Sequence, residues 1–512
     1  MHVVKSYLVD SWIAGQEPTT PLFDAYTGKV MAITSSKGLD LRAALAHARD
    51  VGGPALRAMT FTQRGELIKK LSEVVHASRD ELCELAGKNS GNTRSDAKFD
   101  VDGGSGTLAY YASLGKKLGD KTHVLDGAAD PILRSARFVG QHVYLPRHGV
   151  AIHINAFNFP AWGLCEKLAA AFLAGMPVLV KPATATCLVT ARIVEKWVEA
   201  GILPAGTLQL LCGSAGDLLD HVGPQDVVSF TGSGETGRMI RGHAAVLRWN
   251  VRVGVEADSL NAAVLGPDVE VGSETFQMFV NETSKDITQK AGQKCTAIRR
   301  IVVPTALADE AIAALADRLS QAVLGNPDER ATTVSPLATE SQQADAWRRI
   351  EDLALVATRV AGDPDEVPET GFFVGPSLFR VEGGAAAPFV HDHEIFGPVA
   401  TVIPYDGSAA EAVAIVARGR GSLVTSVYTD DTTWAKDVLF GIAPHNGRVQ
   451  WGSKKVHDQG AGPGTVLPQF VHGGPGAAGG GEELGGERGL AFYWQRTAIQ
   501  GDRALLERIG LV

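Results

Sequence analysis

Val150-Ala151-Ile152-His153-Ile154 is the first of several short apolar runs that alternate along the chain with helical patterns. Leu164 to Leu173 follows as a helix that ends at Gly175, and Pro177 to Pro182 is the next apolar run. The alternation continues with a helix through Glu199 and with strand patterns at Thr207 to Leu211 and Asp226 to Phe230. Strands separated by roughly ten to fifteen helical residues predict parallel βαβ units. The predicted fold class is therefore α/β, with ligands bound beyond the carboxyl ends of these strands.

A second α/β region follows Cys295. Ile301-Val302-Val303 is strand-like, Asp309 to Leu319 has a helical pattern, and Val399 to Ile403 is a later apolar run. The stretch from His472 to Gly489 is dense in glycine, which indicates irregular backbone. We expect this stretch to be either a loop that lines a site or a flexible connector.

Length and composition agree with a globular protein of more than one domain. The chain has 512 residues, of which 45% are hydrophobic and 21% charged, so we expect two or three domains. The net charge of -9 is spread along the sequence without a basic block, which argues against nucleic acid as a partner. No run reaches about 18 apolar residues, and the segment after Met1 lacks the pattern of a signal peptide. We expect no membrane partner and a cytoplasmic location.

The five cysteines are scattered, at positions 83, 165, 187, 212 and 295. They lack the close pairs typical of zinc sites and of secreted disulfide frameworks, so we expect reduced thiols and no metal site. Cys295 differs from the others because it lies in a segment of small residues, Ala291 to Thr296, between a helical pattern and a strand. Lys294 could favour the reactive thiolate of Cys295. A packed core cysteine is the alternative interpretation.

Three further segments place polar residues next to predicted strands. Glu256 ends the apolar run Val251 to Val255, where burial would perturb its pKa, although a surface strand end also explains it. Asn158 follows the first strand and could aim its amide at an oxyanion, or serve as a turn residue. Phe230 to Gly237 lies where a strand becomes a helix, so its backbone N–H groups could face a pyrophosphate. A plain tight turn is the alternative, because the segment lacks the P-loop lysine and the usual glycine order.

Together, and in this order, the segments resemble the aldehyde dehydrogenase superfamily across nearly the whole chain. The combination is far more specific than any one segment. The resemblance implies that Cys295 is the nucleophile, Glu256 the general base and Asn158 an oxyanion donor. It also implies a set of cofactor-binding residues: Lys181, Thr184, Gly232, Ser233, Gly237, Glu394 and Phe396. Without the resemblance, Lys181 and Glu394 would be interpreted as solvated surface charges.

The resemblance further implies an aldehyde dehydrogenase fold with a Rossmann-like cofactor domain, an α/β catalytic domain and a small β oligomerisation arm. The corresponding ranges are 1–119 and 142–255 for the cofactor-binding domain, 256–471 for the catalytic domain, 472–488 for a Gly-rich loop, and 120–141 with 489–512 for the arm. We therefore expect a homodimer or a larger homo-oligomer.

The chain also departs from the family pattern. The family commonly has two glycines after its base, whereas Ala257-Asp258 follow Glu256, and Thr296 follows Cys295. Three segments look like those of dehydrogenases that act on ring-cleaved CoA semialdehydes in aerobic benzoate and phenylacetate breakdown: Glu256 to Asn261, His472 to Gly476 and Arg496 to Gly501. The expected substrate is a small-molecule aldehyde carried as a CoA thioester, and a general aliphatic or aromatic aldehyde is the alternative.

The expected cofactor is NADP, with NAD as the alternative. Many NAD-preferring members of the family place a glutamate three residues after the cofactor lysine, where its carboxylate accepts hydrogen bonds from the ribose hydroxyls. Here that position is Thr184, three residues after Lys181. A carboxylate would repel a 2'-phosphate, whereas threonine removes the negative charge and nearby Lys181 adds a positive one.

The implied reaction is the oxidation of an aldehyde to a carboxylic acid through a thiohemiacetal and a thioester on Cys295. A cysteine hydrolase or acyltransferase would use Cys295 and Glu256 without a cofactor, and its usual partner is a histidine beside the nucleophile. The cofactor segments argue against that class. A catalytically silent relative is the third interpretation, which the joint presence of Cys295, Glu256 and Asn158 disfavours.

Overall fold

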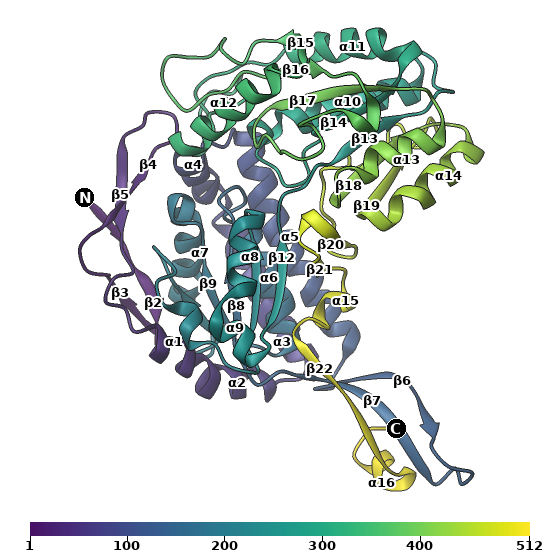
Figure 1. The fold of residues 1–512 in the computed structure, drawn as a ribbon. Coiled ribbons are helices and arrows are strands. Elements are labelled where there is room, and N and C mark those ends of the chain that lie inside the picture. The colour runs from purple at the N-terminus through teal and green to yellow at the C-terminus, as the bar shows by residue number, and fades with distance from the viewer.

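Two seven-stranded sheets form the body of the computed structural model, which describes residues 1–512 (Figure 1). The first sheet has the order β12-β11-β8-β9-β10-β2-β3, and the run at Val150 to Ile154 supplies its strand β8 (Ala151–Ile154). The other strands are β2 (Ser6–Leu8), β3 (Ser11–Ile13), β9 (Val178–Lys181), β10 (Leu208–Leu210), β11 (Val227–Thr231) and β12 (Arg252–Glu256). Strands β8 to β12 run parallel, as the sequence pattern predicts.

Helices cover both faces of the first sheet. They are α1 (Leu41–His47), α2 (Gly53–Arg57), α3 (Phe61–Ala77), α4 (Arg79–Ser90), α5 (Arg94–Leu118), α6 (Trp162–Ala174), α7 (Cys187–Glu199), α8 (Gly234–Gly242) and α9 (Ala244–Trp249). Successive strand residues point to opposite faces, so Ala151 packs with α3 to α7 while Ile152 packs with α1, α8 and α9. Burial on both faces explains why these strands are continuous apolar runs.

The second sheet has the order β15-β16-β17-β14-β13-β18-β19, and all its strands except β15 run parallel. The strands are β13 (Ala262–Leu265), β14 (Arg300–Pro304), β15 (Thr358–Gly362), β16 (Ser377–Arg380), β17 (Val399–Tyr405), β18 (Ser422–Tyr428) and β19 (Asn446–Gly452). The helices are α10 (Glu274–Thr288), α11 (Ala308–Ser320), α12 (Glu340–Ala354), α13 (Ala409–Ala417) and α14 (Thr432–Ile442).

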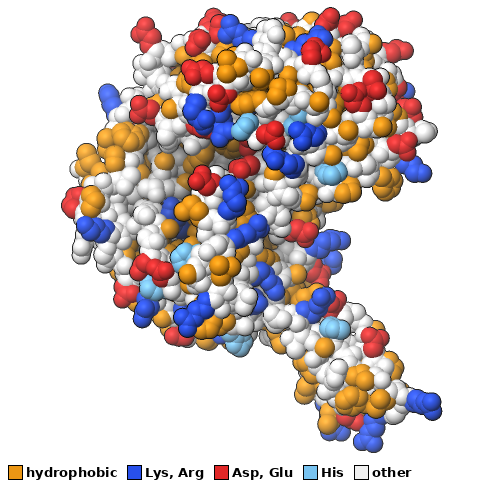
Figure 2. All heavy atoms as spheres, in the orientation of Figure 1, with side chains coloured by type: hydrophobic (Ala, Val, Ile, Leu, Met, Phe, Trp, Pro, Cys, Tyr) orange, Lys and Arg blue, Asp and Glu red, His pale blue; other side chains and the backbone are white.

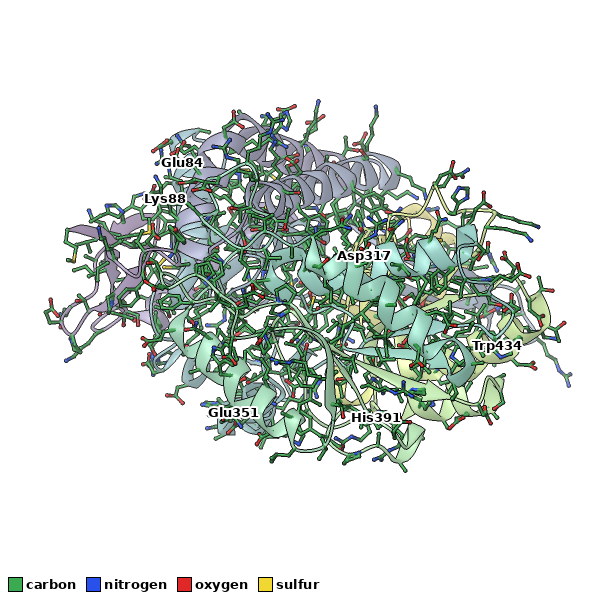
Figure 3. All side chains as sticks on the ribbon, turned by 90° about the horizontal axis from the view of Figure 1, so that it is seen from above. Glu84, Lys88, Asp317, Glu351, His391 and Trp434 are labelled. Atoms are coloured by element: carbon green, nitrogen blue, oxygen red, sulfur yellow. The ribbon has the colours of Figure 1, made fainter.

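The two helical layers of the second sheet follow the same rule. Ile301 and Val303 pack with α10 and α11, while Val302 packs with α12 to α14 on the other face. Seen from above, Asp317 on α11 and Trp434 on α14 lie well apart from Glu84 and Lys88 on α4, which belongs to the first sheet (Figure 3). None of the helices combines the length and the apolar character that crossing a bilayer requires.

Two three-stranded sheets complete the outline. One is formed at the N-terminus by β1 (His2–Val4), β4 (Thr20–Phe23) and β5 (Val30–Thr34). The other is an antiparallel arm of β6 (Val124–Pro131), β7 (Phe138–Pro146) and β22 (Trp494–Asp502), followed by α16 (Arg503–Arg508). The arm projects from the body, and apolar side chains gather on its surface (Figures 1 and 2). Those exposed on it are Ile132, Leu133, Phe138, Leu145, Leu505 and Ile509.

The glycine-rich segment is packed against the first sheet. It forms the hairpin β20 (Val471–Gly473) and β21 (Glu482–Leu484), followed by α15 (Glu487–Leu490). Gly481 N–H donates to the carbonyl of Val255, and Ala257 N–H donates to the carbonyl of Ala478. The segment therefore lines the edge of β12 and is no loose connector.

Candidate active site

The carboxyl ends of the first sheet form one side of the site. Lys181, Thr231 and Glu256 are the last residues of β9, β11 and β12. The register of the parallel strands pairs Thr231 with Glu256. Asn158 lies in the loop that follows β8. These positions agree with the rule that open α/β sheets bind ligands beyond the carboxyl ends of their strands.

The second sheet faces the site with its amino ends. Cys295 precedes β14, and Glu394 precedes β17. Asn261, directly before β13, donates from Nδ2 to the carbonyl oxygens of Cys295 at 2.8 Å and Ala297 at 2.9 Å. The backbone around the sulfur is thus fixed by a side chain from the start of a neighbouring strand.

A strained turn presents Cys295. The turn includes the short helix η4 (Gln289–Gly292), and its residues 290 to 292 have φ angles of 56°, 50° and 70°. Left-handed backbone costs about 1–2 kcal/mol for each non-glycine residue. At Gly292 a side chain is excluded, because a Cβ would lie 2.1 Å from the carbonyl oxygen of Gly397. Lys290 is buried and donates from Nζ to Oδ1 of Asn92 at 3.0 Å, which anchors the turn.

The charge of Lys294 is not directed at the sulfur of Cys295, although the two residues are neighbours in the sequence. Its ammonium contacts Oδ1 of Asp286 at 2.5 Å and Oε1 of Gln289 at 2.9 Å, and the side chains of both Lys294 and Asp286 are buried. The expectation that Lys294 favours the thiolate is wrong, because α10 supplies a carboxylate that engages the charge. The nitrogen next to the sulfur belongs to His472.

His472, Glu256 and Cys295 form a cluster of ionisable side chains. Nε2 of His472 lies 3.0 Å from Oε2 of Glu256 and 3.7 Å from Sγ of Cys295. The sulfur, the nitrogen and a carboxylate oxygen all lie within 4.8 Å of one another. His472 and Glu256 are 5% and 3% exposed, so water screens their charges poorly. The three residues come from β20, β12 and the turn before β14.

The pKa values in this cluster reflect burial and mutual attraction. Burial acts to raise the pKa of Glu256, but the charge of His472 and its hydrogen bond outweigh burial and lower the pKa to about 2. Burial acts to lower the pKa of His472, and the carboxylate of Glu256 reverses this and raises it. Burial, followed by the charge of Glu256, raises the pKa of the Cys295 thiol well above its ordinary value. These directions favour an imidazolium–carboxylate pair beside a neutral thiol.

Cys295 lines a cavity of about 40 Å³. Phe99, Trp162 and Val466 give it apolar walls, and Asn158 also lines it. Nδ2 of Asn158 donates to the carbonyl of Gln293 at 3.0 Å, which holds the amide near the turn that carries Cys295. An apolar cavity with a few converging polar groups is typical of a small-molecule site.

The turn at Phe230 to Gly237 begins α8. Ser233 is the N-cap of this helix, and its Oγ accepts a hydrogen bond from Thr236 N–H at 3.3 Å. Gly234 N–H donates to Oδ1 of Asp258 at 2.9 Å. The departure from the family pattern at Asp258 therefore places a carboxylate at the helix end that we expect to face a pyrophosphate. Gly232 follows β11 directly, and its N–H donates to the carbonyl of Glu256.

Lys181 and Thr184 lie together beyond the end of β9. Nζ of Lys181 is 3.5 Å from Oγ1 of Thr184, and burial lowers the pKa of Lys181. Thr184 starts the short helix η2 (Thr184–Thr186) and donates its hydroxyl to the carbonyl of Gly213 at 2.9 Å. Its hydroxyl is thus engaged, and a lone pair of Oγ1 faces the lysine.

Glu394 is held by Arg299 and by the backbone. Oε1 accepts from Nε of Arg299 at 3.1 Å, and Oε2 accepts from Ser259 N–H at 3.2 Å. Burial raises the pKa of Glu394, and the arginine opposes this rise. The guanidinium of Arg299 also lies 5.3 Å from the centre of the Phe396 ring, so the two predicted cofactor residues of this segment share one arginine.

The residues at the strand ends fit a nicotinamide dinucleotide, the cofactor that the resemblance implies. Oγ1 of Thr231 is buried without a hydrogen-bond partner, and Nζ of Lys181 has one long contact. Gly237 lets α8 approach β12 closely, because a Cβ there would lie 2.8 Å from Cγ1 of Val255. Unsatisfied donors beside a closely packed helix N-terminus suit ribose and phosphate groups.

Some residues at the site do not follow from the sequence pattern. His472 stands at the start of the glycine-rich segment, and its burial beside Cys295 follows only from the fold. Glu166 and Lys167 also line the cavity. Nζ of Lys167 lies 3.4 Å from Glu166 and 3.0 Å from Glu483, and burial raises the pKa of Glu166 to about 7. The signal in the sequence is the pair Glu166-Lys167 inside the otherwise apolar helix α6, where uncompensated charges would be costly.

Comparison with known proteins agrees with this geometry. The aldehyde dehydrogenase family matches residues 12–499 of the chain. The chain is 44% identical over 476 residues to 3,4-dehydroadipyl-CoA semialdehyde dehydrogenase from Aromatoleum evansii, with 92% of each chain covered.

Solved structures share the fold. PnpE in complex with nicotinamide adenine dinucleotide superposes with a TM-score of 0.85 at 24% identity, covering 97% of both chains. Betaine aldehyde dehydrogenase from Staphylococcus aureus in complex with NAD+ superposes with a TM-score of 0.84 at 25% identity, covering 98% of this chain and 95% of the other.

Proposed function

The chain belongs to the aldehyde dehydrogenase family, and we propose that it oxidises a semialdehyde carried on coenzyme A, such as 3,4-dehydroadipyl-CoA semialdehyde, to the acid. The observation that carries the chemistry is the contact between Sγ of Cys295 and the buried pair of His472 and Glu256 under a cavity. The relative at 44% identity supports the substrate class, because its name states that substrate.

The first half of the reaction is an attack on the aldehyde carbon. The thiolate of Cys295 forms the carbon–sulfur bond, and the carbonyl oxygen becomes an oxyanion that we assign to the amide of Asn158 and the backbone N–H of Cys295. Donors already fixed in place stabilise this charge without reorganising. The hydrogen bond from Asn158 to Gln293 keeps the amide beside the nucleophile turn.

Lys181, Thr184, Gly232, Ser233, Gly237, Glu394 and Phe396 would hold the cofactor. A bound nicotinamide supplies the acceptor for the hydride that leaves the substrate carbon. The thioester that remains on Cys295 completes the first half of the reaction. Asp258 must release Gly234 N–H if a phosphate is to take that donor.

The second half of the reaction is hydrolysis of the thioester. We assign to Glu256 the removal of a proton from water, which attacks the thioester carbon and frees the acid. The sulfur leaves as a thiolate and is ready for another aldehyde. Glu256 is almost completely buried, so bulk water screens its charge poorly.

The substrate class is tested by comparing one aldehyde in two forms. We expect kcat/KM for a CoA semialdehyde to exceed that for the same aldehyde without CoA by at least about tenfold, since binding energy from a remote group can assist the reacting centre. Following the absorbance of the reduced cofactor gives both values. Equal values would leave a general aliphatic or aromatic aldehyde dehydrogenase as the function.

We infer a preference for NADP over NAD from Thr184. No carboxylate stands three residues after Lys181, so nothing there repels a 2'-phosphate. The solved neighbours named above hold NAD. Both are distant in sequence, and use of NAD alongside NADP is compatible with the same site.

We also propose a cytoplasmic enzyme of aromatic ring breakdown that assembles as a homodimer or larger homo-oligomer. All five cysteines are free, which suits a reducing compartment. The exposed apolar side chains on the arm of β6, β7 and β22 support assembly through that arm. Measuring the mass in solution of the whole chain and of a variant with Leu133→Asp would test this: the variant should form smaller species.

A cofactor-independent cysteine hydrolase is the second candidate, because a histidine does lie beside Cys295. Its distance of 3.7 Å from the sulfur satisfies the geometry that such an enzyme needs. Activity decides between the two. A dehydrogenase consumes an aldehyde only when NADP or NAD is present, whereas a hydrolase would turn over a CoA thioester without either.

A further inference from the structure

Glu256 and Cys295 raise a problem of charge when both are ionised. The proposed reaction needs a thiolate for the attack and a carboxylate to activate water. Their reacting atoms lie within 4.8 Å of each other, and Glu256 is almost completely buried. Two anions at this separation repel strongly when water is excluded. A positive charge close to both would remove the conflict.

His472 is placed to supply that charge. Its Nε2 is within hydrogen-bonding reach of both groups, 3.0 Å from the carboxylate oxygen and 3.7 Å from the sulfur. The nearby cations are engaged elsewhere: Lys294 contacts Asp286, and Lys167 contacts Glu166 and Glu483. Arg448 donates to the carbonyls of Pro463 and Thr465.

The hairpin fixes this position. His472 pairs with Glu483 in the register of β20 and β21. The next residue, Gly473, has φ of 140°, and a Cβ there would lie 2.0 Å from the carbonyl oxygen of Gly481. Only glycine therefore fits at the end of β20, and this backbone holds the imidazole 3.7 Å from the sulfur of Cys295.

We propose that His472 is the positioning cation that allows the Cys295 thiolate and the Glu256 carboxylate to exist side by side. With an imidazolium at Nε2, loss of the thiol proton to solvent takes the three side chains from a net charge of zero to minus one. Without it, the same loss would take them from minus one to minus two. The inference rests on the proposed role of Cys295 as nucleophile.

The ionisable groups around His472 support a protonated imidazole. Glu256 on β12 and Glu166 on α6 act to raise its pKa, while burial and Arg448 on β19 act to lower it, and the net direction is upward. Cys295 faces the same nitrogen from the turn before β14. The net upward shift of the His472 pKa favours the charged form of the imidazole.

The test is the rate at which iodoacetamide alkylates Cys295, measured against pH by mass spectrometry of the whole protein. The alkylation rate follows the thiolate fraction and needs neither aldehyde nor cofactor. Four proteins are compared: wild type, His472→Phe, Glu256→Gln and the double variant. Cys295→Ala identifies alkylation at other cysteines.

We expect His472→Phe to slow alkylation at pH 7 by at least tenfold and to move its pH profile upward, since the remaining carboxylate opposes the thiolate. Adding Glu256→Gln to His472→Phe should restore part of the rate, because it removes that carboxylate. Such a rescue is a coupling that a purely structural role of His472 would not produce. An unchanged profile in His472→Phe, or no rescue in the double variant, overturns the proposal.

His472→Gln covers the case in which phenylalanine prevents folding. Glutamine retains a donor without a charge, so it should also slow alkylation, and a wild-type profile in this variant overturns the proposal. The two proposals fail separately. If alkylation follows the expected order while no aldehyde is oxidised with NADP or NAD, the proposed function is wrong and the proposed role of His472 stands. If aldehyde is oxidised but alkylation does not follow the expected order, only the proposed role of His472 is wrong.

Discussion

The two seven-stranded sheets are alike in size and parallel direction, yet they meet the site with opposite ends. The first sheet contributes residues at strand carboxyl ends, such as Lys181 and Glu256. The second contributes Cys295 and Glu394 from loops before its strands. The first sheet therefore places its candidate residues where open α/β sheets bind ligands. The second supports the turn that places Cys295, the proposed nucleophile, beside them.

Cys295→Ala should abolish dehydrogenation, because it removes the proposed nucleophile that the second sheet supports. We expect a loss of at least about 10³-fold in kcat, because no thioester can form. Cofactor binding, measured by titration of protein fluorescence, should remain, since the strand ends of the first sheet are untouched. Cys83→Ala is the matched control, because Cys83 is a free cysteine on α4. Substantial turnover by Cys295→Ala would move the nucleophile elsewhere.

Glu256→Gln should slow thioester hydrolysis, which we assign to Glu256 of the first sheet. It should leave the formation of the thioester on Cys295, which precedes β14 of the second sheet, partly active. An amide cannot accept the proton of water, so we expect hydrolysis to slow by about 10²-fold or more. A burst of reduced cofactor and an acyl adduct on Cys295 should appear in rapid mixing and intact-protein mass spectrometry. If neither is seen while alkylation of the thiol is also lost, Glu256 is needed to activate Cys295 itself.

Asn158→Ala should remove a hydrogen bond between the loop after β8 of the first sheet and the turn before β14 of the second sheet. The amide follows β8 of the first sheet and donates to Gln293 in the turn before β14. Removing a fixed donor to an oxyanion costs about 10²-fold in kcat in comparable sites. We expect that loss in kcat with a smaller change in KM. A change confined to KM would assign Asn158 to substrate binding alone.

Thr184→Glu should change cofactor choice without touching the second sheet. A carboxylate beside Lys181 would repel a 2'-phosphate, so we expect the ratio of kcat/KM for NADP to that for NAD to fall by about tenfold. Thr184→Ser, which retains the hydroxyl that donates to Gly213, should leave the ratio alone. The preference for NADP is wrong if wild type favours NAD or if glutamate does not alter the ratio.

Acid should weaken the ion pair of Glu256 and His472 and so lower the stability that this pair contributes. The pKa of Glu256 falls from the ordinary 4.5 to about 2, so its charge contributes stability that is complete above about 4.5 and lost toward pH 2. The raised pKa of His472 means that its contribution is present at low pH and lost as pH rises through the folded-state value. We expect the Tm of wild type to exceed that of Glu256→Gln by about 2–4 °C at pH 6 and by less at pH 3. Glu310→Gln, at an exposed position on α11, is the control, and a gap that does not change with pH would contradict the pairing.

The same comparison explains what could be predicted from sequence. Strand patterns locate carboxyl ends, so local sequence makes Glu256 and the turn at Phe230 candidates, and only their combination with the other segments makes them specific. Amino-end loops carry no such rule, and Cys295 was identifiable mainly through its resemblance to a family. Lys294 was misassigned because the carboxylate that engages it, Asp286, is reached only once α10 is in place. His472 stands out in the sequence only as part of a resembling segment, because its contacts with Glu256 and Cys295 are formed by a hairpin far along the chain.

The position of the hairpin β20–β21 in the chain also means that His472 is synthesised well after Cys295. His472 follows Cys295 by 177 residues, and ribosomes add about 5–20 residues each second. On the order of ten to thirty seconds therefore separates the synthesis of the nucleophile from that of the histidine beside it. During this interval the thiol belongs to an unfinished protein that lacks β20, β21 and the outer strand of the arm. On the proposed role of His472, the thiol gains its full reactivity only after most of the chain has been made.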